Sequence, residues 1–184
     1  LVALMDSDDV CVENRFEKQI KLFSKDKSIC VLGGQIEEFN EENHIIGKRV
    51  VPLSDKKIKN FMKYRCPMNQ VTVMFKKDEV MDVGGYLDWY SNEDYYLWIR
   101  MYLKGKTFQN LEETLVKVQV NDAMYKRRGG LNYFKSESIL QIFMYKKNII
   151  SFPLLCYNII IRFIVQLVMP NNFRRAVFNK MFRN

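Results

Sequence analysis

The chain has 184 residues, of which 48% are hydrophobic, and it carries a formal net charge of +8. This length and apolar content suffice for a globular domain with a hydrophobic core and exclude an intrinsically disordered chain. The four cysteines are widely spaced without a C-x-x-C pair, and there is a single histidine. A structural zinc site and a Cys–His or Ser–His–Asp nucleophile are therefore disfavoured, and we interpret the cysteines as reduced, buried residues of a cytosolic protein.

Strands and helices alternate along the first 125 residues. Apolar runs predict strands at residues 1–5, 28–32, 50–51, 71–75 and 115–120. Helical spacing, as of Phe16, Ile20 and Phe23, predicts helices at residues 13–25, 55–65 and from about 91 to 105. The pair Gly33–Gly34 is expected to close a strand, and Gly84–Gly85 to form a turn with unusual backbone angles. This order of elements predicts an α/β fold.

Three carboxylates, those of Asp6, Asp8 and Asp9, directly follow the first apolar run, which we expect to be a buried strand. Ligands of open α/β sheets bind at the carboxyl ends of strands, and Mg²⁺ or Mn²⁺ prefers carboxylates together with nucleotide phosphates. The alternative is an ordinary solvated turn. The sequence therefore predicts a site for a metal and a diphosphate, or no site at all.

A second acidic pair, Glu93 and Asp94, lies at the expected start of a helix. Ser91 and Asp94 have the spacing of a capping box, in which the acid satisfies the first free amides of the helix. A carboxylate at a helix N-terminus is also favoured in its ionised form, and a general base must be ionised to work. A structural cap and a catalytic base are both compatible with this pattern.

Ordered motifs extend the pattern along the chain: MDSDD at residues 5–9, ENRFEKQ at 13–19, VLGG at 31–34, PMNQVTVMF at 67–75, VGGY at 83–86, EDYYLW at 93–98 and NL at 110–111. Together they resemble the bacterial family 2 glycosyltransferases of the GT-A fold, over residues 1 to about 130. The resemblance implies a partial GT-A fold, that of the nucleotide-diphospho-sugar transferases. The opening strand and helices of that family, which bind the nucleotide base, have no counterpart in the chain. We therefore expect these 184 residues alone to turn over poorly.

The resemblance implies an inverting, metal-dependent, hexosyltransferase-like enzyme. Asp6, Asp8 and Asp9 would bind the nucleotide-sugar donor, with Asp8 and Asp6 at the Mn²⁺ or Mg²⁺ ion and Asp9 supporting the loop. Many relatives have a further histidine ligand after the last strand, where this chain offers only Asn121 or Asp122. Either Asn121 or Asp122 would take the place of that histidine, or the metal would be held only by Asp8 and the donor.

The resemblance also implies roles on the acceptor side. Asp94 would deprotonate the acceptor hydroxyl, and Glu93 would orient that base or bind the acceptor. The acceptor pocket would be shaped by Gly84, Gly85, Tyr86 and Trp98. For Trp98 a position in the hydrophobic core is the alternative.

The last part of the chain, residues 126–184, differs in character from residues 1–125. It contains 11 Lys and Arg against Glu137 alone, whereas residues 1–125 contain 18 Lys and Arg against 20 Asp and Glu. Residues 149–169 include 13 Leu, Ile, Val or Phe. We interpret residues 126–184 as a basic, amphipathic helical tail, and residues 1–125 as the metal and acceptor half of a glycosyltransferase domain.

Polar residues of the tail follow one another at helical intervals, at Ser151, Asn158, Arg162 and Gln166. Such a stripe with basic flanks favours a helix lying on an anionic membrane surface. In residues 173–183, aromatic and apolar residues are interleaved with basic ones in the same way. Packing on the domain and a membrane-spanning helix are the alternatives. Nucleic-acid binding is disfavoured because the aromatic residues lie within aliphatic runs.

The expected function is sugar transfer to a glycan or lipid-linked acceptor in capsule, O-antigen or other surface polysaccharide synthesis. The expected location is the cytoplasmic side of the bacterial plasma membrane, with peripheral attachment. The alternative is a non-catalytic GT-A remnant, or an interaction module that binds membranes.

Overall fold

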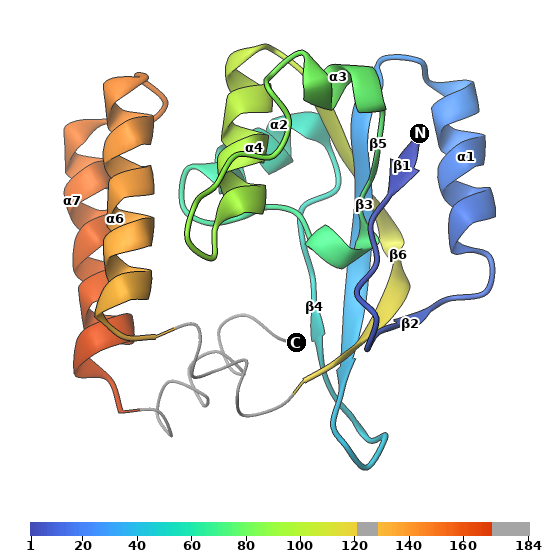
Figure 1. The fold of residues 1–184 in the computed structure, drawn as a ribbon, viewed down its shortest axis with the longest axis horizontal. Coiled ribbons are helices and arrows are strands. Elements are labelled where there is room, and N and C mark those ends of the chain that lie inside the picture. Colours follow the sequence, from blue (N-terminus) through green and yellow to red (C-terminus); the bar gives the residue numbers. More distant parts are fainter. Residues whose placement is uncertain (121–128, 171–184) are drawn as a thin grey trace.

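The computed structural model describes residues 1–120 and 129–170, which fold around a six-stranded mixed sheet (Figure 1). The strand order is β1–β5–β3–β6–β2, and β4 pairs with β3 outside this path. The strands are β1 (Val2–Ala3), β2 (Val10–Cys11), β3 (Ile29–Phe39), β4 (Ile45–Arg49), β5 (Met74–Phe75) and β6 (Thr107–Gln119). Strands β3 and β6 run parallel, and the other pairs run antiparallel. The α/β fold class is confirmed, and the arrangement is consistent with a partial nucleotide-sugar transferase fold.

Helices lie on both sides of this sheet (Figure 1). Helix α1 covers one side, α2 and α4 cover the other, and the antiparallel pair α6–α7 lies outside α2 and α4. The helices are α1 (Arg15–Lys25), α2 (Asp55–Met62), η1 (Gln70–Thr72), α3 (Lys77–Met81), α4 (Glu93–Leu103), α6 (Leu131–Lys146), α7 (Phe152–Phe163) and the π-helical turn η2 (Ile164–Val168). The helices expected at residues 13–25, 55–65 and 91–105 are confirmed, with shorter ends.

The main hydrophobic core joins the sheet to the helices of the tail. It contains Val31 of β3 and Trp98 of α4 together with Leu140 of α6 and Leu155 of α7. A smaller core lies under α1 around Phe23. Helices α6 and α7 therefore pack on the same core as the sheet. The boundary expected near Tyr125 lies outside the described residues, as do Asn121, Asp122 and residues 173–183.

Strand β1 is a two-residue edge strand and not the buried strand that the apolar run predicts. It pairs only with β5, and Leu1 and Met5 are 59% and 38% exposed. The carboxylate loop that follows therefore needs another support, which α1 provides. Arg15 is fully buried and donates a hydrogen bond to the Leu4 carbonyl at 2.9 Å.

The pair Gly33–Gly34 lies inside β3 and does not end it. A Cβ on Gly33 would lie 2.5 Å from Asn110 Oδ1, and one on Gly34 would lie 2.6 Å from the Leu115 side chain. The two glycines therefore allow β6 to pack closely on β3. The other expected pair, Gly84–Gly85, has φ angles of +88° and +67° and forms the predicted turn.

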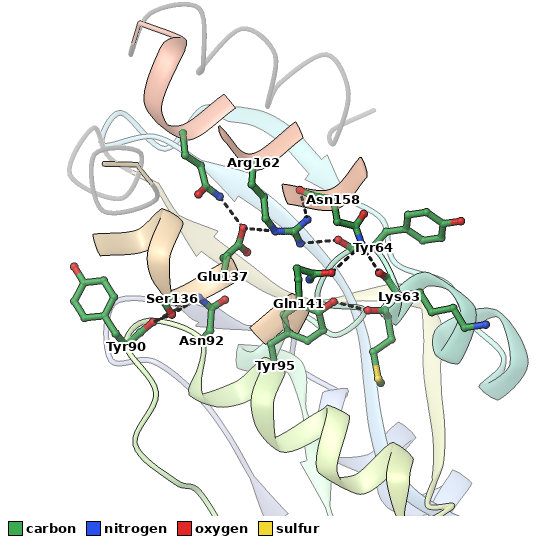
Figure 2. A network of polar contacts seen from close by, with 12 residues as sticks. Lys63, Tyr64, Tyr90, Asn92, Tyr95, Ser136, Glu137, Gln141, Asn158 and Arg162 are labelled. Carbon is green, nitrogen blue, oxygen red and sulfur yellow. Dashed lines mark hydrogen bonds and ion pairs between the residues drawn. The ribbon is translucent and has the colours of Figure 1, made fainter. Parts of the chain in front are cut away.

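The polar stripe of α7 faces the protein. Asn158 Nδ2 donates hydrogen bonds to the Lys63 carbonyl at 2.9 Å and to Gln141 Oε1 at 2.8 Å. Arg162 donates to the Tyr64 carbonyl at 2.8 Å and forms an ion pair with Glu137 at 2.9 Å (Figure 2). These contacts seat α7 on α6 and on the segment after α2.

Leu154, Leu155 and Ile159 of α7 pack on the main core, and many of the other apolar side chains of α7 and η2 point outward. Those exposed by more than 40% are Phe152, Tyr157, Ile160, Ile161, Phe163, Ile164 and Val168. The expectation that the polar stripe of this helix faces water is therefore wrong for Asn158, Arg162 and Gln166, which are at most 8% exposed. Within residues 1–120 and 129–170, no helix combines the length and apolar character needed to span a bilayer.

Replacing Arg162 with Met should lower the free energy of unfolding by about 3–5 kcal/mol, because it leaves the Glu137 carboxylate, whose side chain is only 14% exposed, without its cation. Chemical denaturation measures this loss. The control is Lys18→Met, which breaks the Lys18–Glu113 pair, whose side chains are 34% and 53% exposed. That change should cost less than about 1 kcal/mol. Equal losses in the two variants would contradict the structural role of the Arg162–Glu137 pair.

Candidate functional site

A cleft of about 520 Å³ opens between the carboxylate loop, the start of α4 and the pair α6–α7. It brings together the two acidic groups that the sequence singles out: Asp6, Asp8 and Asp9 on one side and Glu93 and Asp94 on the other. These groups are separated by more than 80 residues in the chain. The cleft is therefore the place where the expected donor-side and base residues meet.

The carboxylate loop is tied to the sheet through Asp9. Its Oδ1 accepts a hydrogen bond from the backbone N–H of Gln119, at the end of β6, at 3.2 Å. Asp9 Oδ2 is buried and has no hydrogen-bond partner among the residues that the structure describes. Burial raises the pKa of Asp9 to about 6, the Gln119 N–H opposes this rise, and the neighbouring carboxylates of Asp8 and Asp6 add to it.

A divalent cation fits the electrostatics of this loop. A positive charge would relieve the repulsion among the three carboxylates and would satisfy the buried Asp9 oxygen. Within the described residues, however, no three His, Cys, Asp or Glu side chains are arranged as a metal-binding cluster. One or two carboxylates together with substrate phosphates are a usual ligand set for Mg²⁺. The loop fits a cation that is held jointly by protein and substrate.

The capping box expected at Ser91 and Asp94 does not form. Ser91 has a φ angle of +53°, the N-cap residue is Asn92, and its side chain makes no capping hydrogen bond. Asn92 instead donates to Ser136 Oγ of α6 at 3.2 Å (Figure 2). Helix α4 thus begins one residue later than the motif predicts, at Glu93.

Asp94 is fixed by two donors and faces the cleft. Its Oδ1 accepts the Tyr95 backbone N–H at 2.6 Å, and its Oδ2 accepts a weak hydrogen bond from the Cys66 thiol at 3.6 Å. Burial raises the pKa of Asp94, the neighbouring Glu93 carboxylate adds to the rise, and the Tyr95 amide, Arg49 and the Cys66 thiol oppose it. A carboxylate with a raised pKa is a stronger base.

The residues expected to shape the acceptor pocket separate into two groups. Tyr86 is 39% exposed and is not among the residues that line the cleft. Desolvation of its hydroxyl nevertheless raises the pKa of that group, and the charge of the nearby Asp94 adds to this effect. Gly84 and Gly85 form the turn just before Tyr86, and the Gly85 carbonyl accepts a hydrogen bond from Arg100 at 2.7 Å. Trp98 is corrected to a core position, because it is 0% exposed and packs edge-on against Phe108.

Curated relatives of the chain are bacterial glycosyltransferases. It is 42% identical over 134 residues to an uncharacterized glycosyltransferase of Haemophilus influenzae, covering 72% of this chain and 49% of the relative. It is 37% identical over 185 residues to the Escherichia coli UDP-Gal:alpha-D-GlcNAc-diphosphoundecaprenol beta-1,3-galactosyltransferase, covering 100% and 66%. It is 39% identical over 137 residues to the amylovoran biosynthesis glycosyltransferase AmsE of Erwinia amylovora, covering 74% and 51%.

The chain belongs to a family of bacterial glycosyltransferases. It spans between about half and two thirds of the length of these three relatives. No family model matches it.

Several residues of this cleft carry no signal in the sequence. Arg49 and Cys66 are single residues outside any motif, yet Arg49 donates a hydrogen bond to the Cys66 carbonyl at 3.2 Å and both lie at the cleft beside Asp94. Tyr133 of α6 and Tyr157 of α7 also line the cleft. The resemblance ends near residue 130, so it could not indicate a contribution from α6 and α7.

The pH dependence of stability should distinguish a base from a cap at Asp94. Because the native pKa of Asp94 is raised, the folded protein binds its proton more tightly than the unfolded chain. The contribution of Asp94 to the free energy of unfolding therefore falls as the pH rises from the ordinary aspartate range through the native pKa. Relative to the wild type, Asp94→Asn should gain stability across this window, as measured by chemical denaturation between about pH 4 and 7.5.

The matched control is Asp26→Asn. Hydrogen bonds from Ser28 lower the pKa of Asp26, so its contribution to stability is present above the ordinary pKa and the variant should lose relative stability as the pH rises. A helix cap at Asp94 would give a different result. Asp94→Asn would then be destabilised near neutral pH by about 0.5–2 kcal/mol.

Proposed function

We propose that the complete protein is an inverting, metal-dependent glycosyltransferase of family 2 with a GT-A fold. Its donor would be a nucleotide-diphosphate sugar, and its acceptor a glycan carried on a lipid diphosphate in bacterial surface polysaccharide or O-antigen synthesis. The observation that carries the proposal is the cleft in which the carboxylate loop of Asp6, Asp8 and Asp9 faces Asp94. The E. coli relative, named for transfer from UDP-Gal to alpha-D-GlcNAc-diphosphoundecaprenol, supports the substrate classes.

The carboxylate loop would serve the donor. Asp8 and Asp6 are the residues that would hold Mn²⁺ or Mg²⁺, and Asp9 would keep the loop on β6 through its hydrogen bond to the Gln119 amide. When bound, such an ion supplies charge neutralisation for the departing nucleotide diphosphate. The exposed position of β1 at the sheet edge leaves the loop open to the donor.

Asp94 would serve the acceptor. Its carboxylate takes the proton of the acceptor hydroxyl as that oxygen forms a bond to the anomeric carbon of the donor sugar. The bond from this carbon to the nucleotide phosphate breaks on the opposite face, so that one displacement inverts the configuration. The Cys66 thiol and the Tyr95 amide orient the two carboxylate oxygens, and Glu93 and Tyr86 flank the acceptor side.

Replacing Asp94 with Asn in the complete protein should lower kcat for sugar transfer by about 10²–10⁴-fold, because the amide accepts no proton. The thermal transition of this variant should lie no lower than that of the wild type, because loss of the carboxylate with its raised pKa does not destabilise the fold. The control is Asp88→Asn, which removes an exposed carboxylate of the preceding loop that does not line the cleft and should leave kcat unchanged. A wild-type protein without transferase activity would favour the alternative, a non-catalytic remnant that binds membranes.

The outward apolar face of α7 supports attachment to an anionic membrane surface. Lys146 and Lys147 lie at the end of α6, next to the start of α7, and residues 126–184 contain 11 Lys and Arg. Apolar side chains with a basic surround bind the interface of a bilayer with anionic lipids. We propose peripheral attachment to the cytoplasmic side of the plasma membrane, where a lipid-linked acceptor would be within reach of the cleft.

The double variant Ile164→Glu and Val168→Glu should shift the complete protein from the membrane fraction to the supernatant at low salt, because carboxylates on the outward face oppose insertion among anionic headgroups. Sedimentation with vesicles that contain about 30% anionic lipid measures the shift. The matched control is Ile20→Glu, an equally exposed site on α1, across the sheet from α7 (Figure 1). Unchanged sedimentation of the double variant would remove α7 as the attachment surface.

A further inference from the structure

One row of α7 side chains belongs to both the cleft and the outer surface. Tyr157 and Ile161 of α7 and Val165 of the following η2 line the cleft at intervals of four residues, which places them along one side of this helical segment. Tyr157 and Ile161 are also 56% and 41% exposed. This row is the rim of the cleft on the α7 side.

Helical geometry places the rim between two other rows of α7. With 100° per residue, the buried stripe of Asn158 and Arg162 lies on one side of the rim, and the outward row of Ile160 and Ile164 lies on the other. The contacts agree with this order, since Arg162 bonds inward to Tyr64 and Glu137 while Ile160 is 56% exposed. An unbroken apolar path therefore runs from the outer surface of α7 over the rim into the cleft.

The cleft beside this rim also contains cationic groups. Arg65 and Arg49 are among its lining residues, and Arg49 lies close enough to Asp94 to lower the pKa of that carboxyl against the effect of burial. Guanidinium groups recognise phosphate oxygens. The cleft thus combines a carboxylate, guanidinium groups and an apolar rim. These groups suit the three parts of an acceptor that consists of a sugar hydroxyl, a diphosphate and an apolar chain.

We propose that Tyr157 and Ile161 form a subsite for the apolar chain of the acceptor, at the point where it joins the diphosphate. The proposal rests on the proposed transferase function and deepens it, because it assigns recognition of the acceptor lipid to two residues of the cleft. The subsite contacts the chain directly, and is separate from attachment of the outward row to a membrane.

The test compares two water-soluble acceptors in a membrane-free assay with the complete protein. Both are esters of N-acetylglucosamine diphosphate, one carrying a methyl group and the other an undecyl chain, used below the concentration at which the latter aggregates. The wild type should show a KM for the undecyl ester that is lower by roughly tenfold or more, because the chain covers the apolar rim. The ratio of the KM for the methyl ester to the KM for the undecyl ester should fall close to one in Ile161→Ser. The same ratio should also fall in Tyr157→Ser.

The matched control is Ile160→Ser, the same change one residue away in the outward row, which should retain the wild-type ratio. Retention of the preference in both Ile161→Ser and Tyr157→Ser would overturn the subsite. Equal loss of the preference in Ile160→Ser would also overturn it, because the outer surface would then be binding the chain. Absence of transfer by the wild type to either ester would instead contradict the proposed function, and the subsite with it. Unchanged thermal transitions of the exposed-site variants exclude misfolding as the cause.

Discussion

The buried ion pair between Arg162 and Glu137 is the interaction on which the arrangement of the cleft depends. A charged pair taken out of water is tolerated only when its geometry is good and its remaining hydrogen-bonding groups are satisfied. Here Arg162 also reaches the Tyr64 carbonyl, and Glu137 also accepts a hydrogen bond from Gln166 at 2.6 Å. These requirements fix the rotation of α7 about its axis. The polar stripe must face the protein, and the apolar side chains on the opposite side of the helix, such as Ile160 and Ile164, are left outside.

The segment at residues 63–66 links the contact surface of α7 to the surroundings of Asp94. The carbonyls of Lys63 and Tyr64 accept the hydrogen bonds from α7, and two residues later the Cys66 thiol contacts Asp94. The outward-facing helix and the base therefore share one short stretch of backbone. A shift of α7 would therefore change the position of the groups that contact Asp94, because only residues 63–66, whose carbonyls and thiol are hydrogen-bonded, separate the two. A second buried polar hub, Arg15 and Gln19 of α1, fixes the other wall: Gln19 bonds the carbonyls of Leu32 and Thr72, while Arg15 holds the strand before the carboxylate loop.

The sequence predicted those parts of the fold that local periodicity determines, and failed where tertiary packing overrides it. Helix α1 was expected from the spacing of Phe16, Ile20 and Phe23, but Phe16 and Ile20 are about half exposed, and Arg15 and Gln19 are buried in their place. The same inversion occurs in α7. A pattern of polar and apolar residues gives the period of a helix, but it assigns the buried face only when no buried polar network reverses that assignment.

In the candidate site, too, the features that are local in the sequence could be predicted and those that depend on tertiary contacts could not. The two acidic groups could be predicted, because each is a cluster at the end of an element, and the structure brings them to one cleft. The residues that tune Asp94 could not, because Arg49 and Cys66 approach it only after β4 and the segment following α2 are folded together. The glycines of β3 were predicted to end that strand, since close packing against β6 is invisible in the sequence of one strand alone.

The position of Asp94 sets opposing effects against each other. The start of α4 favours its ionised form through the helix dipole and the Tyr95 amide, while burial and the Glu93 carboxylate favour its protonated form. The net result is a raised pKa, and hence a higher affinity for the proton, in a carboxylate whose two oxygens are both held by donors. An exposed carboxylate at the same helix start would be ionised but weakly basic, and a fully buried one would stay protonated. Asp94 is only partly buried at the edge of the cleft, and this position allows a single residue to be both oriented and basic.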